Sequence, residues 1–173
     1  EYENLLVIET PGMPKADRRR LMDELSRWGE VETVSSCYQL PFAASGNNVS
    51  LPGDDRDLFN IADMYFVGDN YFETMGIPIV EGGGFTPGAP NERSIIVSQS
   101  FVERMAEVTG WTGSAIGREV LVSEHSESEQ DAFTIVGVHR DFRLGNLKDD
   151  AARSLRPTVF FFDGPGAFVQ PEN

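Results

Sequence analysis

The sequence predicts an α+β fold with mixed sheets, two main helices, a βαβ-type lobe and a smaller β-rich lobe. Apolar residues recur at helical spacing in two stretches, residues 15–28 and residues 101–106. Short apolar or alternating runs of strand length lie around these stretches, and Gly, Pro and Asn clusters separate them. The order strand, helix, strand in the first forty residues predicts the βαβ-type lobe. With 173 residues, the chain is long enough to bury a core.

The first lobe is predicted to open with a buried strand at residues 5–8, which form a continuous apolar run. A helix follows over residues 15–28, and its apolar face consists of Leu21, Met22, Leu25 and Trp28. Gly29 is expected to end this helix. Residues 31–40 are rich in β-branched and small residues, which predicts a second strand.

The middle of the chain is predicted to hold a strand that is buried on both faces. Residues 41–56 contain several Gly, Asn and Pro residues and predict an irregular excursion or a loose hairpin. Residues 58–67 are apolar on both faces of a period-two pattern. Asn70 then opens a short helix that Gly76 ends, and residues 77–80 follow as an extended run. The apolar side chains of the short helix are expected to pack in the core rather than contact a ligand, namely Tyr71, Phe72 and Met75.

The second main helix is predicted to follow a strand at residues 94–97. Ser98 or Ser100 can cap this helix, and its apolar face consists of Phe101, Val102, Met105 and Ala106. Residues 120–123 and 133–138 are expected to pair as a hairpin whose charged tip is residues 124–131. Residues 158–162 predict one more strand.

Composition excludes several classes of partner. The formal net charge of −14 repels phosphate backbones and anionic headgroups, so we expect no nucleic-acid partner and no lipid surface contact for the bulk of the protein. Cys37 is the single cysteine, so it cannot form an internal disulfide, and a buried small hydrophobe is its expected role. No apolar stretch approaches membrane-spanning length. The chain starts at Glu1 without Met and soon enters a predicted strand, which indicates a segment excised from a longer protein.

One stretch matches a catalytic motif but lacks its context. His139, Arg140, Asp141 and Asn146 fit the pattern of a kinase catalytic loop. The glycine-rich loop over the phosphates, the lysine–glutamate pair and the downstream Asp-Phe-Gly are missing from the sequence. We therefore expect Asp141 to cap the turn after its strand by accepting backbone amides.

Other patterns do not predict an enzyme, a metal site or a cofactor site. Residues 82–84 are three glycines, but no Lys-Ser or Lys-Thr follows them, so they predict a flexible turn rather than a phosphate cradle. Two histidines without helical i, i+4 ligand pairs do not predict a zinc site. The acidic cluster of Asp54, Asp55 and Asp57 lacks the ligand spacing of an EF-hand, which favours a solvated turn over calcium binding. We predict no catalytic residue and no cofactor.

Several blocks of the sequence fall in the order found in a known family. The first block consists of Tyr71, Phe72, Gly76, Ile77, Glu81, Gly82 and Phe85. Residues 94–105, 115–121 and 133–142 follow as a strand-to-helix segment and two strands, and residues 157–160 as a Pro-x-apolar-aromatic run. Together these blocks resemble the extracytoplasmic core domain of MacB/FtsX-type ABC transporter permeases. Gly83 stands where that family usually carries Arg, so any ion pair of that Arg is absent.

The resemblance implies a non-catalytic domain between transmembrane helices, on the periplasmic side of the bacterial inner membrane. Residues 1–173 would be a single extracytoplasmic domain fragment, with one lobe of residues 1–57 plus 94–110 and another of residues 58–93 plus 115–162. The domain would transmit ATP-driven motion to an efflux substrate or a partner protein. The implied partners are the permease's own transmembrane helices, an ABC ATPase subunit or domain, a second permease copy, and a periplasmic adaptor or lipoprotein.

Two loops are the candidate contact regions for such partners. They are residues 82–93 and residues 124–131, and the candidate contact residues are Gly82, Gly83, Gly84, Arg93, Glu124, Glu127 and Glu129. The alternative function is a free-standing domain that binds a small cationic ligand through its acidic surface. A thermal-shift screen separates the two, because a specific small ligand would raise the melting temperature.

Overall fold

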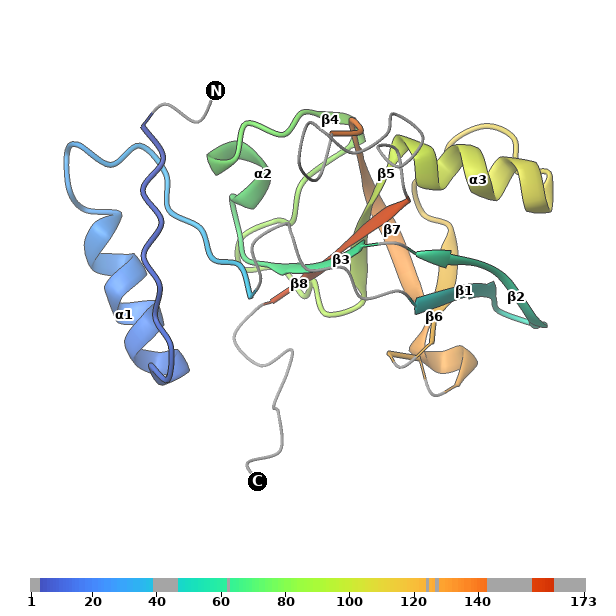
Figure 1. The fold of residues 1–173 in the computed structure, drawn as a ribbon, viewed down its shortest axis with the longest axis horizontal. Helices are drawn as coiled ribbons and strands as arrows, with labels where there is room; N and C mark the ends of the chain where they lie inside the picture. Colours follow the sequence, from blue (N-terminus) through green and yellow to red (C-terminus); the bar gives the residue numbers. More distant parts are fainter. Residues whose placement is uncertain are drawn as a thin grey trace, which may run out of the picture.

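The computed structural model describes residues 4–38, 47–61, 63–123, 125–126, 128–142 and 157–163. It has an α+β fold in which few helices surround a curled mixed sheet (Figure 1). The helices are α1 (Lys15–Leu25), α2 (Tyr71–Thr74) and α3 (Gln99–Thr109), with a 3-10 turn η1 (Glu129–Asp131). The strands are β1 (Asn47–Leu51), β2 (Asp54–Ile61), β3 (Asp63–Val67), β4 (Ile79–Gly82), β5 (Ser94–Ser98), β6 (Glu119–Val122), β7 (Phe133–His139) and β8 (Thr158–Phe162).

The described strands form one eight-stranded sheet, in which seven strands follow the order β2-β1-β6-β7-β5-β8-β3 and the eighth, β4, pairs with β7 off this path. Strand β7 lies near its centre and pairs with β5 in parallel and with β6 antiparallel. Strand β4 pairs antiparallel with the C-terminal half of β7. The parallel pair of β3 and β8 closes one edge of the sheet. Strands from both predicted lobes therefore pair within the same sheet.

The core consists of two apolar clusters on opposite faces of this sheet. The first cluster contains Val159 and Phe161 of β8 together with Phe101 and Met105 of α3. The second contains Phe160 and Phe162 of β8 together with Tyr71 and Phe72 of α2. Because successive residues of a strand point to opposite faces, α3 and α2 cover opposite sides of the sheet. Strand β8, which lies next to the edge strand β3, is consequently buried on both faces.

Most of the predicted elements after residue 46 are confirmed. The strand at residues 94–97 is β5, the hairpin of residues 120–123 and 133–138 is β6 with β7, and the strand at residues 158–162 is β8. The loose hairpin expected within residues 41–56 is β1 with β2, and its turn contains Gly53 at φ 79°, but β2 continues to Ile61. The single strand predicted at residues 58–67 is therefore divided between β2, which pairs with β1, and β3, which pairs with β8. The part of that segment before residue 47 lies outside the described residues.

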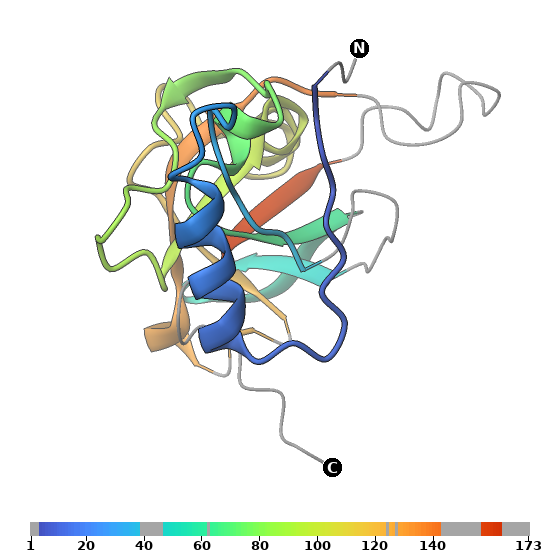
Figure 2. The same cartoon turned by 90° about the vertical axis from the view of Figure 1, so that its left-hand side faces the viewer.

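The strand predicted at residues 5–8 is wrong. Leu6, Val7 and Ile8 are 80%, 52% and 48% exposed and belong to no strand. In Figures 1 and 2 this segment runs beside α1 and away from the sheet. An apolar run becomes a strand only when another strand offers its backbone groups, and no described strand lies beside this one. The predicted strand–helix–strand unit in the first forty residues therefore retains its helix alone.

The strand predicted at residues 31–40 is reduced to a single antiparallel bridge between Cys37 and Val67. Tyr38 N donates to Phe66 O at 2.9 Å, and Gly68 N donates to Ser36 O at 2.8 Å. Residues 39 and 40 lie outside the described part of the chain. The bridge leaves Cys37 half-buried at the outer edge of β3, and burial is the main cause that raises the pKa of its thiol.

The first helix is confirmed but ends at Leu25, four residues before Gly29. None of the residues of α1 is buried, and Trp28, predicted on its apolar face, is 54% exposed. The helix lies beside the sheet rather than on one of its covered faces (Figures 1 and 2). None of the described helices combines the length and the apolar character that a membrane span needs.

Candidate functional site

The first predicted contact loop, residues 82–93, is anchored to the sheet at its start. Gly82 ends β4 with φ 71°, a backbone conformation that residues with a Cβ rarely adopt. Gly83 N donates to Val136 O of β7 at 3.1 Å. A Cβ on Gly82 would meet the Val136 carbonyl oxygen, whereas one on Gly83 or Gly84 would meet open space. Of the three glycines, only Gly82 must therefore be glycine, because β4 approaches the backbone of β7 closely there.

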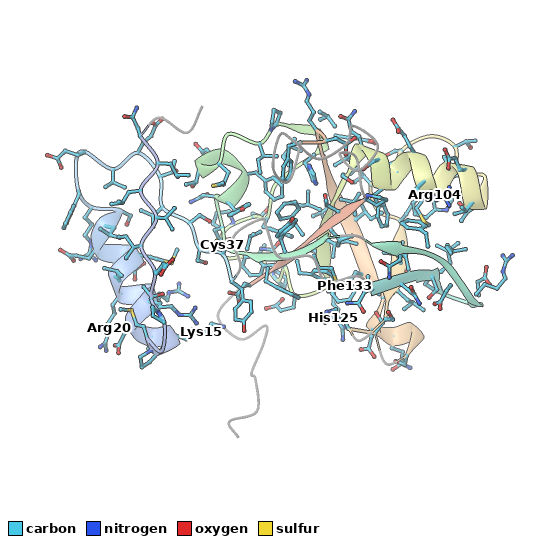
Figure 3. The ribbon with its side chains drawn as sticks, in the orientation of Figure 1. Lys15, Arg20, Cys37, Arg104, His125 and Phe133 are labelled. Carbon is cyan, nitrogen blue, oxygen red and sulfur yellow. The ribbon has the colours of Figure 1, made fainter. Side chains whose placement is uncertain are left out.

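The end of the same loop is fixed by Arg93, which links it to the second predicted contact loop. The Arg93 guanidinium donates to the backbone oxygen of Asp131 at 3.1 Å and to its carboxylate at 2.5 Å. The guanidinium also lies 5.6 Å from the ring centroid of Phe133, which Figure 3 labels at the start of β7. The sequence predicted both loops as surface regions, but the contact between Arg93 and Asp131 joins residues 38 positions apart and was not predicted.

The second loop, residues 124–131, is held in place through Asp131. Ser128 donates its backbone N–H at 3.1 Å and its hydroxyl at 3.0 Å to the Asp131 carboxylate. These Ser128 contacts and then the Arg93 guanidinium hold the pKa of Asp131 below its usual range. Glu129 belongs to η1, while Glu124 and Glu127 lie outside the described residues.

A hollow lies between the short helix α2, β4 and the start of the first loop. Its volume is about 440 Å³. Its lining includes the rings of Tyr71, Phe72 and Phe85, which are only 4–6% exposed and also belong to the core. The prediction that the α2 aromatics pack as core anchors is therefore confirmed, but the hollow that they border was not predicted. We call this hollow the α2 groove.

The α2 groove does not assemble catalytic chemistry. Glu73 and the buried Tyr71 are the ionisable residues among its described lining residues, so no set of acid, base and nucleophile converges there. The described residues contain no group of three His, Cys, Asp or Glu side chains arranged to hold a metal ion. In the acidic cluster weighed as a calcium site, Arg56 hydrogen-bonds Asp54 and lowers the pKa of that carboxyl to about 2.

The His139–Asp141 stretch belongs to a hydrogen-bond network inside the fold. The His139 ring is fully buried; its Nδ1 lies 2.8 Å from Arg140 O and its Nε2 lies 2.9 Å from Thr158 Oγ1. Because a carbonyl oxygen only accepts, Nδ1 carries the proton and Nε2 accepts from the Thr158 hydroxyl. Both ring nitrogens are thereby satisfied, and neither activates a serine.

The prediction that Asp141 caps the turn after its own strand is wrong, because its carboxylate instead caps the first turn of α3. Its carboxylate accepts the Ser100 N–H at 3.1 Å and the Ser100 hydroxyl at 2.8 Å, in the first turn of α3. The N-cap of α3 is Ser98, whose hydroxyl accepts the Phe101 N–H at 3.1 Å, so one of the two predicted caps is confirmed. A carboxylate at a helix N-terminus is favourable because free N–H groups and the helix dipole meet it there.

We expect the domain to become less stable as the pH decreases, because the His139 ring is buried in its neutral form. Burial is the main cause that lowers the pKa of His139 below 6.5. As the pH falls below about 6.5, the imidazole of His139 binds a proton in the unfolded chain but stays neutral in the folded chain. The free energy of unfolding should decrease by up to about 1.4 kcal/mol per pH unit, until the pH reaches the folded pKa.

Denaturant unfolding between pH 7.5 and pH 5 measures this slope. The variant His139→Gln should lose the His-dependent part of the slope, while His125→Gln, at the other histidine of the sequence, should keep it. Equal slopes in the wild type and in His139→Gln would show that the buried ring does not govern the pH dependence.

Comparison with known proteins identifies the family. The profile described as MacB-like periplasmic core domain matches residues 2–161, which is most of the chain. The chain therefore belongs to this family, and the resemblance found in the sequence is confirmed. It is a periplasmic core domain of the kind that MacB-like ABC transporter permeases contain. No curated protein matches the chain.

Solved structures with similar folds include three transporter domains. The periplasmic region of MacB from Actinobacillus actinomycetemcomitans is 16% identical, with a TM-score of 0.49 over 87% of this chain and 61% of that one. The extracellular domain of the noncanonic ABC-type transporter YknZ from Gram-positive bacteria is 14% identical, with a TM-score of 0.49 over 81% and 59% of the two chains. A domain of a putative permease protein from Porphyromonas gingivalis is 17% identical, with a TM-score of 0.45 over 73% and 47%. The chain thus spans about half to three fifths of these structures.

Proposed function

We propose that this domain transmits conformational change from an ABC transporter permease to its substrate or to a partner protein. Membership of the MacB-like family supports a place on the periplasmic side of the bacterial inner membrane. In this proposal ATP binding and hydrolysis elsewhere move the transmembrane helices, and the domain moves with them. The domain needs no catalytic group of its own for that role.

A relay must be stiff where it carries force and accessible where it makes contact. Clusters of buried side chains on both faces of the sheet supply the stiffness. The observation that best supports contact at the two loops is the Arg93–Asp131 ion pair, because it couples them to each other. Arg93 O also accepts the Thr134 N–H at 2.8 Å, which ties the pair to β7. Motion of the sheet would therefore move both loops together.

The proposed partners follow from this role. They are the permease's own transmembrane helices, its ABC ATPase subunit or domain, a second permease copy, and a periplasmic adaptor or lipoprotein. The candidate contact residues are Gly83, Gly84, Glu124, Glu127 and Glu129, with Gly82 and Arg93 holding the ends of the first loop.

Loop replacement in the full-length permease tests the proposal. One variant carries a Gly-Ser linker in place of residues 86–90, and another carries Gly or Ser at Glu124, Glu127 and Glu129. Both variants retain the residues that anchor the loops or pack in the core, namely Gly82, Gly83, Phe85, Asn91, Arg93, His125, Ser126, Ser128 and Asp131. We expect each replacement to leave the fold intact and to lower transport or partner binding severalfold.

The matched control is Pro52→Ser, which keeps Gly53, in the exposed turn between β1 and β2. Transport assays and co-purification of partners give the functional readout, and the melting temperature reports the fold. Unchanged transport and partner binding in both loop variants would contradict the proposal.

A further inference from the structure

We propose that the α2 groove is a docking site for a protein segment that presents an apolar side chain next to a lysine or arginine. This inference rests on the proposed function, because it names the chemistry of the partner. The groove adjoins the first contact loop, since Gly84, Phe85, Thr86 and Pro87 form one of its walls. A partner that reaches this loop would therefore meet the groove.

The floor of the α2 groove is apolar and rigid. The Phe72 ring lies 4.9 Å from Phe160 in an edge-to-face contact and 6.4 Å from Phe85, measured between ring centroids. Ile77 and Ile79 are half-buried and complete the apolar lining. Rings that are already fixed lose little conformational entropy when an apolar side chain packs on them. The floor therefore favours an aliphatic or aromatic side chain.

The charge at the rim of the α2 groove determines which residue of the partner is favoured beside its apolar side chain. Glu73 is exposed at the rim, and the described residues provide no ion-pair partner for it. The described lining contains no lysine, arginine or histidine. The chain as a whole carries a net charge of −14, which adds to the attraction for a cation. A basic neighbour is thus favoured and an acidic one disfavoured.

The open form of the groove favours a protein segment over a free small molecule. Glu73, Gly84, Thr86 and Pro87 are exposed, so the rim faces solvent. Sites for small molecules usually enclose most of the ligand surface. A side chain delivered by a partner needs no such enclosure, because the rest of the partner covers the rim.

Amide chemical shifts of the isotope-labelled 173-residue chain test the proposal. The probes are the blocked peptides acetyl-Leu-Phe-Lys-amide and acetyl-Leu-Phe-Glu-amide, with phenethylamine as a small cation. We expect the Lys peptide to shift the amides of α2 and of residues 84–87, and to bind about two- to fivefold more tightly than the Glu peptide, as one exposed ion pair allows. Glu73→Lys should reverse this order, while Glu103→Lys, on exposed α3 surface, should not.

Three outcomes would overturn the proposal. Equal affinity for the two peptides, or shifts confined to other regions, would exclude the groove as a basic-segment site. Tighter binding of phenethylamine than of the Lys peptide would assign the groove to a small molecule. If the Lys peptide does not bind at the α2 groove while the loop variants lose transport, the groove proposal is rejected and the proposed relay function stands. Peptide binding combined with unchanged transport in those variants would reject the relay instead.

Discussion

Replacing Phe160 by alanine is expected to destabilise the domain by about 3–5 kcal/mol, the largest effect of any single substitution proposed for this chain. Phe160 lies in β8 and is completely buried. Truncating a fully buried phenylalanine removes its transfer free energy and leaves a cavity that the surrounding structure fills only in part.

The cavity would be costly because rings surround Phe160 on several sides. Its centroid lies 4.8 Å from Tyr65, 4.9 Å from Phe72 and 5.1 Å from His139. These residues come from β3, α2 and β7, so no single element can move in to close the gap. The same rings form the floor of the α2 groove or support it, and the groove should therefore lose its shape as well.

Equilibrium unfolding in urea measures this loss, with Trp28→Ala as the matched control. Trp28 is a larger aromatic residue but is 54% exposed, so its truncation should cost less than about 1 kcal/mol. Similar losses in the two variants would mean that the Phe160 ring does not anchor the core. A reduced denaturant slope in Phe160→Ala would indicate a loosened native state rather than a simple cavity.

Local sequence patterns were sufficient to predict the elements of the sheet that are buried on both sides. Residues 158–162 are apolar without interruption, and both faces of β8 are covered. Helix α3 was predicted with its cap because Ser98 precedes an apolar helical face. In both cases the information needed lies within about ten residues, which is the range over which propensity and periodicity act.

The same patterns failed where the outcome depends on distant partners. Residues 5–8 have the composition of a strand but meet no strand among the described residues, whereas β3 gains a parallel partner in β8, about ninety-five residues away, pairing Asp63 with Thr158. The order of strands in the sheet is likewise a tertiary property. Local composition does not encode which edge is free.

The candidate site was predicted in part for a similar reason. Glycine and proline content located the loop of residues 82–93, and acidic content located the loop of residues 124–131. Their connection through Arg93 and Asp131, and the α2 groove beside the first loop, depend on which strands pair with β7. The one available signal was charge, since Arg93 and Asp131 each lie just before a predicted strand. That signal is too common to identify a pair alone.

The second large effect is expected at Gly82, where alanine should destabilise the domain by about 2–5 kcal/mol. The positive φ of 71° costs a residue with a Cβ about 1–2 kcal/mol. The new Cβ would also collide with the carbonyl oxygen of Val136 and with the Ile116 side chain, and forced backbone shifts in a packed region add about 1–3 kcal/mol. Because the carbonyl is part of β7, relief requires β4 to separate from the sheet.

The neighbouring glycines provide controls in the same turn. A Cβ at Gly83 or Gly84 would meet no atom within 4 Å, and neither residue has a positive φ. Alanine there should be neutral or stabilise the domain by up to about 1 kcal/mol, because it restricts the unfolded chain. Thermal or urea unfolding of the three single variants compares them directly. Equal stability of Gly82→Ala and Gly84→Ala would show that β4 does not approach β7 closely. It would also contradict the claim that the first contact loop is anchored to the sheet at its start.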